Sequence, residues 1–386
     1  MDLTLNNAVM GVELSGIRQF TYLVRDTPGA CALTIGEPDL NTPDVIKEAA
    51  KAALDANDTH YPPGNGYPYA LEAISKFEAE AHGLHYAPSE VILTVGATEA
   101  LFASFSTILN PGDEVIIPTP AFGLYEALVQ LQGGVPVSLP TEHNHFQIVP
   151  EELKAAITDR TKAIILTSPN NPTGVVYSRQ TLEGLAELLR RKSAQFGHPL
   201  YLIADEPYRE LVYDGVEVPF LPTIYPNTLV CYSYSKSLSL PGERIGYVCV
   251  PSCVEGQADV LHAVAGAARS SGHVCPPTLV QLALQRCADA RPDLAAYDAN
   301  RRLLYRELTQ MGYECIPPQG AFYLFVRVPD GDDVAFSQRA KLEHDLLVVP
   351  STAFHCPGFL RLSYCVSHDM ILRSLPAFRA IREKYQ

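Results

Sequence analysis

Three polar clusters in the middle of the chain each lie where a short apolar run ends, which is where the carboxyl end of a β-strand is expected. SPNNPTG (168–174) follows AIILT, ADEPY (204–208) follows YLI, and SYSKSLSLPGERIG (233–246) follows TLVCY. The second cluster offers a carboxylate, Asp205, and the third a lysine amine, Lys236. Burial near other cations lowers the pKa of a lysine, so its neutral amine becomes available as a nucleophile and a general base. Taken singly, each cluster also fits a helix cap, a solvated lysine or an ordinary turn.

The elements that must position these clusters form an alternating series. Between about residue 90 and 250, short apolar runs alternate with amphipathic stretches, a pattern typical of a mainly parallel sheet with helices on both faces. Ligands of such α/β sheets bind at the carboxyl ends of the strands, where the polar clusters lie. The predicted strands are VILTV (91–95), EVIIP (114–118), AIILT (163–167), YLIAD (201–205), TLVCY (228–232) and YVCV (247–250).

The pattern changes toward the C-terminus. Residues 253–311 read as helical, with Pro276 and Pro277 where a helix could start. A smaller α/β domain is expected beyond them, joined by the N-terminal segment of about 40 residues. Its predicted elements are strands at 321–328, 346–350 and 359–366 and helices near 332–345 and 367–384. The predicted division is an N-terminal arm (1–40) that forms part of the small domain, a large domain (41–290) and a small C-terminal domain (291–386).

Composition excludes several classes of protein. The 29 Lys and Arg and 43 Asp and Glu give a formal net charge of −14 at pH 7, which would repel nucleic acid over most of the surface. The nine cysteines are an odd number without a CxxC pair, as expected for free thiols in a reducing compartment. The first residues lack the basic start and apolar core of a signal peptide, and no run of 18 apolar residues occurs. We therefore expect a cytoplasmic protein that binds neither nucleic acid nor a membrane.

Other short motifs carry no convincing chemistry. GNGYPYA (64–70) matches a dinucleotide fingerprint by letters, but THYPP before it is no strand and Pro68 interrupts it, so a surface loop is predicted. HGLH (82–85) and EHNH (142–145) come with no third metal ligand and are interpreted as solvated polar turns. No metal site is predicted.

In combination, the three clusters are specific. SPNNPTG, then DEPY, then SYSK with an arginine eight residues after the lysine, resembles the class I and II aminotransferases of the aspartate aminotransferase fold type. The resemblance extends from SGIRQF (15–20) and LTIGEPD (33–39) through VGATEAL (95–101) to RLS (361–363). It implies a large domain with a mainly parallel, seven-stranded type of sheet sandwiched by helices, a smaller α/β domain, and pyridoxal 5'-phosphate as cofactor. It also implies ping-pong transfer of an amino group from an amino acid to a 2-oxo acid.

The cofactor ring sets the first group of expected roles. Lys236 would bond to the cofactor aldehyde and, once released, carry the substrate's α-proton. Asp205, at a strand end, would hold the pyridine nitrogen protonated, because a buried carboxylate raises the pKa of that nitrogen. By resemblance, Tyr208 and Asn171 would hydrogen-bond the phenolic oxygen of the ring, and Phe122 would stack on its face, where relatives often have Tyr or Trp. Tyr208 could instead be a core aromatic.

The cofactor phosphate requires fixed donors. Arg244 offers a planar fork of N–H groups, and Ser233, with Ser235 as a second candidate, offers a hydroxyl. The backbone amides of Gly96, Ala97 and Thr98 would form the start of a helix whose positive end faces the anion.

The substrate and a second subunit account for the remaining candidates. By resemblance, Arg361 would bind the α-carboxylate as a bidentate partner, with Asn171 beside it, and Gly36 would let the backbone approach closely. Tyr61 matches a tyrosine that reaches the cofactor phosphate of the neighbouring subunit, which implies a homodimer with shared sites. A surface turn aromatic is the alternative for Tyr61.

Substrate identity is the least constrained feature. Thr98 stands where aspartate-preferring bacterial members often carry Lys, and no second arginine matches a distal carboxylate, so the resemblance favours neutral or aromatic amino acids with 2-oxoglutarate as acceptor. Two alternatives remain at this point. A pyridoxal-phosphate lyase of the same fold, cleaving a carbon–sulfur bond or eliminating across Cα and Cβ, would share the cofactor motifs. A non-catalytic ligand-sensing domain would usually follow a DNA-binding module, for which the early start of the resemblance leaves no room.

Overall fold

The computed structural model describes residues 5–12, 27, 29–83, 85–287 and 290–385. The SGIRQF motif lies outside this part of the chain. Among the helices formed by the described residues, none combines the length and apolarity needed to cross a membrane.

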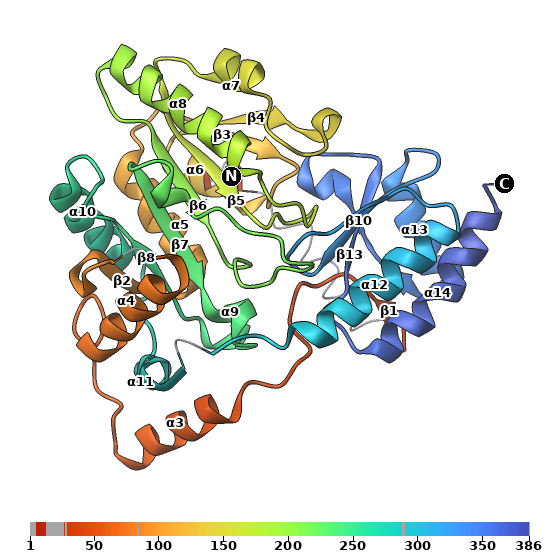
Figure 1. Cartoon of the computed structure of the whole chain (residues 1–386), viewed down its shortest axis with the longest axis horizontal. Helices are drawn as coiled ribbons and strands as arrows, with labels where there is room; N and C mark the ends of the chain where they lie inside the picture. Colours follow the sequence, from red (N-terminus) through yellow and green to blue (C-terminus); the bar gives the residue numbers. More distant parts are fainter. Residues whose placement is uncertain (1–4, 13–26, 28, 84, 288–289, 386) are drawn as a thin grey trace.

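A seven-stranded sheet forms the centre of the large domain (Figure 1). Its strand order is β2-β8-β7-β6-β5-β3-β4, and only β8 runs antiparallel to its neighbours. The mainly parallel sheet predicted from the sequence is therefore confirmed. The strands are β2 Val91–Thr94, β3 Glu114–Thr119, β4 Val135–Pro140, β5 Thr161–Thr167, β6 Tyr201–Asp205, β7 Thr228–Ser233 and β8 Gly246–Cys249.

The strand β4 was absent from the sequence prediction. Its sequence, VPVSLP, contains two prolines, which argue against a central strand. β4 lies at the edge of the sheet, pairs only with β3 and is largely exposed, so a missing backbone N–H is tolerated there.

Helices cover both faces of the sheet (Figure 1). Alternate residues of β6 pack into different cores: Leu202 and Ala204 into the core that contains α4 and α8, and Ile203 into the core that contains α5 and α10. This alternation explains why the strands are apolar throughout. The helices of this part of the chain are α3 Asp44–Asp55, α4 Pro68–His82, α5 Gly96–Ile108, α6 Leu124–Leu131, α7 Pro150–Ala156, α8 Arg179–Phe196, α9 Tyr234–Ser237, α10 Gln257–Ser270 and α11 Thr278–Cys287. The short helix α1 Asn7–Met10 precedes them, and 3-10 helices occur at Pro88–Glu90, Glu142–Asn144, Leu221–Thr223, Pro241–Glu243 and Ser351–Phe354.

The small domain has a core of its own, built around the four-stranded sheet β12-β13-β10-β9. The N-terminal segment joins it through β1, because Cys31 and Ala32 pair in parallel with β11. The small α/β domain with an N-terminal contribution is thus confirmed, whereas the boundaries 1–40, 41–290 and 291–386 stay a prediction. Its elements are β1 Cys31–Ala32, α12 Leu294–Gln310, β9 Cys315–Ile316, β10 Tyr323–Arg327, α13 Asp333–His344, β11 Leu346–Leu347, β12 Val349–Pro350, β13 Phe359–Ser363 and α14 His368–Glu383.

Three local predictions need correction. The expected strand 346–350 is divided between β11 and β12, which belong to different sheets. The expected surface loop 64–70 ends at residue 67, because Pro68 is the first residue of α4, a position at which its missing N–H costs no helical hydrogen bond. His82 is no solvated turn residue: it ends α4, and its ring stacks on Phe220 with centroids 4.3 Å apart.

Candidate active site

A cavity of about 240 Å³ opens where β5, β6 and β7 end and α5 begins. Its lining residues come from the N-terminal segment, from the strand ends of the large sheet and the segments that follow them, and from the small domain. Of the predicted site residues, all but Gly96 and Tyr61 line it: Gly36, Ala97, Thr98, Phe122, Asn171, Asp205, Tyr208, Ser233, Ser235, Lys236, Arg244 and Arg361.

Lys236 occupies α9, a single turn of helix directly after β7. Its amine lines the cavity and donates a hydrogen bond of 2.5 Å to the backbone carbonyl of Gly36. The pKa of this amine is lowered to about 8, chiefly by burial and also by the charges of Arg361 and Arg244, against the raising effect of Cys365 and Glu37. A part of the Lys236 population is therefore neutral near physiological pH and able to act as a nucleophile or a base.

Asp205 is the last residue of β6 and is buried. Its Oδ2 accepts a hydrogen bond of 2.5 Å from the hydroxyl of Tyr125, which is itself hydrogen-bonded to Thr167. Its Oδ1 is buried without a hydrogen-bond partner among the described residues. Burial raises the pKa of this carboxyl to about 6, while hydrogen bonds from Tyr125 and Thr167 lower it. A buried carboxylate with one unsatisfied oxygen, in a residue that lines the cavity, fits a protonated ring nitrogen as its partner.

The start of α5 and Arg244 form one end of the cavity. Gly96, the first residue of α5, has a φ of +75°, and a Cβ added there would lie 2.6 Å from Nη2 of Arg244. Only glycine therefore lets the arginine lie against this backbone. The Ser233 hydroxyl donates to the Ser235 hydroxyl at 2.8 Å, beside the same helix start. A helix N-terminus, a guanidinium and two hydroxyls are donors suited to a phosphate.

Arg361 comes from β13 of the small domain, and 1% of its surface is exposed. Its Nη1 donates to Oδ1 of Asn171 at 3.0 Å, and its Nη2 donates to the backbone carbonyl of Thr34 at 2.5 Å. Its Nε is buried without a hydrogen-bond partner among the described residues. A buried guanidinium with an unused donor beside an open cavity is suited to a carboxylate.

Two predicted site residues, Phe122 and Tyr61, are aromatic and lie differently with respect to the cavity. Phe122 lines the cavity, and its ring meets that of Tyr125 edge-on with centroids 5.8 Å apart. Tyr61 lies outside the cavity of its own chain and is 91% exposed.

Three polar residues that line the cavity were missed by the sequence prediction, namely Tyr125, Thr167 and Tyr323. Tyr125 follows Phe122 by three residues, and Thr167 immediately precedes the SPNNPTG cluster, so proximity to predicted site residues was an available signal. Tyr323 lies within the apolar strand β10, where nothing separates it from a core aromatic. Its hydroxyl is hydrogen-bonded to that of Tyr208 at 2.8 Å.

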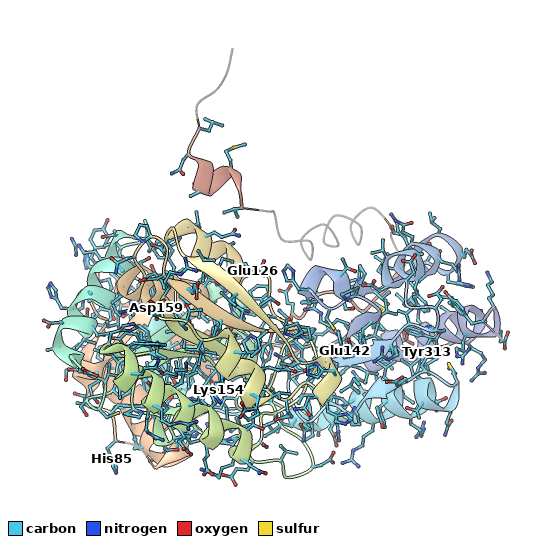
Figure 2. The ribbon with its side chains drawn as sticks, turned by 90° about the horizontal axis from the view of Figure 1, so that it is seen from above. His85, Glu126, Glu142, Lys154, Asp159 and Tyr313 are labelled. Carbon is cyan, nitrogen blue, oxygen red and sulfur yellow. The ribbon has the colours of Figure 1, made fainter. Side chains whose placement is uncertain are left out.

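A larger pocket, of about 570 Å³, lies elsewhere, where Glu142 of the large domain approaches the small domain (Figure 2). Glu142 pairs there with Arg327 of β10 at 2.8 Å. Its lining contains no lysine and no counterpart of the unsatisfied Asp205 oxygen. We therefore place the chemistry in the smaller cavity, where the reactive groups converge.

The described residues contain no group of three His, Cys, Asp or Glu side chains placed to hold a metal ion. At the carboxyl ends of a mainly parallel sheet, the cavity brings together a lysine amine, a buried carboxylate and donors suited to an anion, which are the groups that a pyridoxal-phosphate enzyme requires. The model of the family described as aminotransferase class I and II matches residues 30–378. The chain belongs to this family and is an aminotransferase.

Individual relatives agree with this assignment. A probable aspartate/prephenate aminotransferase of Thermus aquaticus is 38% identical, over 90% of each chain. An aromatic-amino-acid aminotransferase of Thermococcus litoralis is 32% identical, over 99% of each chain. The crystal structure of an aminotransferase from Eubacterium rectale covers 100% of both chains at 41% identity with a TM-score of 0.94. These relatives support amino-group transfer and give no support to the lyase alternative.

Proposed function

We propose that this aminotransferase binds pyridoxal 5'-phosphate in the cavity between Asp205 and Lys236. The observation that carries the proposal is that Asp205, whose buried Oδ1 has no partner among the described residues, lines the same cavity as Lys236, whose amine has a lowered pKa. When bound, the cofactor supplies an aldehyde that bonds to amines and a ring that withdraws electrons.

Lys236 is proposed to hold the cofactor and then to move the α-proton of the amino acid as general base and general acid. Asp205 would keep the ring nitrogen charged, and Tyr208 and Asn171 would hydrogen-bond the phenolic oxygen of the ring. Phe122 would stack on the ring face. The phosphate would be held by the Arg244 guanidinium, the Ser233 and Ser235 hydroxyls and the backbone amides of Gly96, Ala97 and Thr98.

Arg361 is proposed to bind the α-carboxylate, with Asn171 and the Gly36 backbone beside it. Amino acid and 2-oxo acid both carry this carboxylate, so one arginine serves both half-reactions of a ping-pong exchange. Because Arg361 is buried and already oriented by Asn171 and Thr34, little ordering would be needed on binding.

We further propose neutral or aromatic amino acids as donors and 2-oxoglutarate as a suitable acceptor. The cationic side chains that line the cavity in the described part of the chain are Lys236, Arg244 and Arg361, and each already has a proposed partner. The remaining lining includes Leu101 and Leu124, which suit an apolar side chain.

The proposed active unit is a homodimer located in the cytoplasm. Tyr61 is 91% exposed, as a residue that completes the site of a partner subunit would be in a single chain. The described cysteines form no disulfide, and a reducing compartment would keep them as thiols.

A screen of the twenty amino acids against pyruvate and 2-oxoglutarate, with purified cofactor-loaded protein, tests these proposals. We expect turnover to be highest with neutral or aromatic donors and absent in Lys236→Ala. Each donor should also be incubated without an acceptor. An aminotransferase then stops after one equivalent of oxo acid, whereas continuous release of ammonia would overturn the proposed exchange.

A further inference from the structure

Tyr323 lies where three parts of the proposed site meet. It is the first residue of β10 in the small domain and is 2% exposed. In the antiparallel pairing with β13, Phe325 is opposite Arg361, so Tyr323 is a diagonal neighbour of Arg361 on one face of the small sheet. Sequence separation hides this relationship, because β10 and β13 are far apart in the chain.

The hydroxyl of Tyr323 meets the large domain. It is hydrogen-bonded to the hydroxyl of Tyr208 at 2.8 Å, and the two rings meet at 78°. Both hydroxyls are buried, so each depends on the other for a partner.

The ring of Tyr323 meets the carboxylate-binding arginine. The Arg361 guanidinium lies over this ring, 4.5 Å from its centroid. The hydroxyl of Tyr323 also lies so close to Gly36 that a Cβ added at this glycine would be 1.9 Å from the hydroxyl oxygen. One side chain therefore contacts Gly36, Tyr208 and Arg361 at once.

We infer that Tyr323 is a positioning residue with two separable parts, a hydroxyl that orients Tyr208 and a ring that supports Arg361. The inference rests on the proposed function. A phenol has one proton, so if Tyr208 donates to the phenolic oxygen of the cofactor, the bond between the tyrosines must run from Tyr323 to Tyr208. Accepting that bond makes Tyr208 a stronger donor, because hydrogen bonds in a chain polarise one another.

Tyr323→Phe tests the hydroxyl alone. Without this hydroxyl, Tyr208 is a weaker hydrogen-bond donor to the phenolic oxygen of the cofactor. The negative charge of that oxygen is then less stabilised. A proton bound near it is therefore released only at a higher pH. The pH midpoint of the visible-absorbance change of the cofactor-loaded enzyme should rise by roughly 0.2 to 0.6 unit, from a weakening of about 10–30% in a charge-assisted hydrogen bond. Binding of 2-methylalanine, an amino acid without an α-proton, should stay near the wild-type value.

Tyr323→Leu removes the ring as well. The same upward shift of the absorbance midpoint should then be joined by a rise of about 3- to 30-fold in the Kd of 2-methylalanine, since the cationic guanidinium loses its aromatic support. This small ligand offers little more than a carboxylate and an amine, so it reports on Arg361 and not on the side-chain pocket.

Tyr213→Phe is the matched control. Tyr213 is equally buried, donates to the carbonyl of Ala321 at 2.7 Å and does not line the cavity. Its loss should lower the melting temperature without moving the absorbance midpoint or the Kd. The same result in the Tyr323 variants would reduce Tyr323 to a packing residue and overturn the inference. If the wild-type protein itself shows neither a cofactor band nor a spectral response to 2-methylalanine, the proposed function fails and the inference fails with it.

Discussion

Asp205 accepts a hydrogen bond from Tyr125 through one carboxylate oxygen, and its other oxygen is buried without a partner in the described structure. One oxygen of the carboxylate is thus held in place, whereas the other is left without a partner in a residue that lines the cavity. Burial raises the pKa of this carboxyl to about 6, and a positive partner at the unsatisfied oxygen would lower the pKa and extend the ionised range below neutral pH.

Removing the negative charge should disable catalysis. In Asp205→Asn the amide oxygen can still accept from Tyr125, but it cannot hold a ring nitrogen in its charged form. We expect kcat for transamination to fall by about 100-fold or more, the scale of a lost electrostatic contribution. Steady-state kinetics of the cofactor-loaded variant provide the measurement. Asp159→Asn, which removes the same charge from the surface of the large domain (Figure 2), should leave kcat unchanged.

The lowered pKa of Lys236 predicts the pH dependence of cofactor loading. The neutral amine is the reacting form, and with a pKa of about 8 its fraction rises with pH through that value. In cofactor-free protein, the rate of loading should rise about tenfold from pH 7 to pH 9 and then level off. Stopped-flow absorbance can follow this. A rate that keeps rising to pH 10 or beyond would show an ordinary lysine, and Lys236→Ala should develop no such signal.

Arg361→Lys keeps the charge but loses the planar fork. A lysine amine cannot donate simultaneously to Asn171, Thr34 and a carboxylate in the same geometry. We expect KM for the amino donor to rise about tenfold or more with a smaller change in kcat. Arg302→Lys, at an exposed position of α12, is the control. An unchanged KM would place the substrate carboxylate elsewhere.

A buried charged cluster lies next to the site residues. Arg209 is enclosed by aromatic rings, among them Tyr232 at 4.7 Å, and pairs with Glu78 at 2.7 Å and Glu206 at 2.8 Å. Burial raises the pKa of Glu206 to about 7, with Arg209 lowering it and Glu78 raising it. Three carboxylates, those of Glu78, Glu206 and Glu210, share one guanidinium.

This cluster predicts a pH-dependent stability. A carboxyl whose folded pKa is raised from 4.5 to about 7 stabilises the fold fully below about 4.5, and this contribution is lost as pH rises through 7. In Glu206→Gln the loss is removed, so its free energy of unfolding relative to wild type should improve by about 1–3 kcal/mol between pH 5 and pH 8. Urea unfolding at the two pH values measures it. Glu183→Gln, on the exposed side of α8, should show no such change.

Shared active sites predict complementation between two defective variants. Tyr61→Glu would repel the phosphate in the partner's site, and Lys236→Ala disables its own site. Mixed in equal amounts and allowed to exchange subunits, they should recover on the order of a quarter of wild-type activity, because half of the dimers are hybrids with one complete site. Leu342→Glu, a surface change at a 79% exposed residue, should retain activity by itself. No recovery on mixing would mean that Tyr61 serves no second subunit.

The fold was largely predictable because most strands of the large sheet are buried and most of its helices are amphipathic. The exceptions have local physical reasons. The prolines of β4 conceal an edge strand, and five apolar residues at 346–350 do not reveal that the chain passes from one sheet to another between β11 and β12. His82 looked solvated, yet its ring stacks on Phe220 and its side chain is only 15% exposed.

The sequence by itself determined which residue types could do the chemistry, since Lys236, Asp205 and Asn171 lie in motifs at strand ends, where topology brings them to one edge of a sheet. Tertiary structure alone decided the contacts among them. The carbonyl of Gly36 meets the amine of Lys236, and Tyr323 lies under Arg361, across segments widely separated in the chain. Such contacts follow from how two domains and an N-terminal segment pack together, and local periodicity carries no information about that packing.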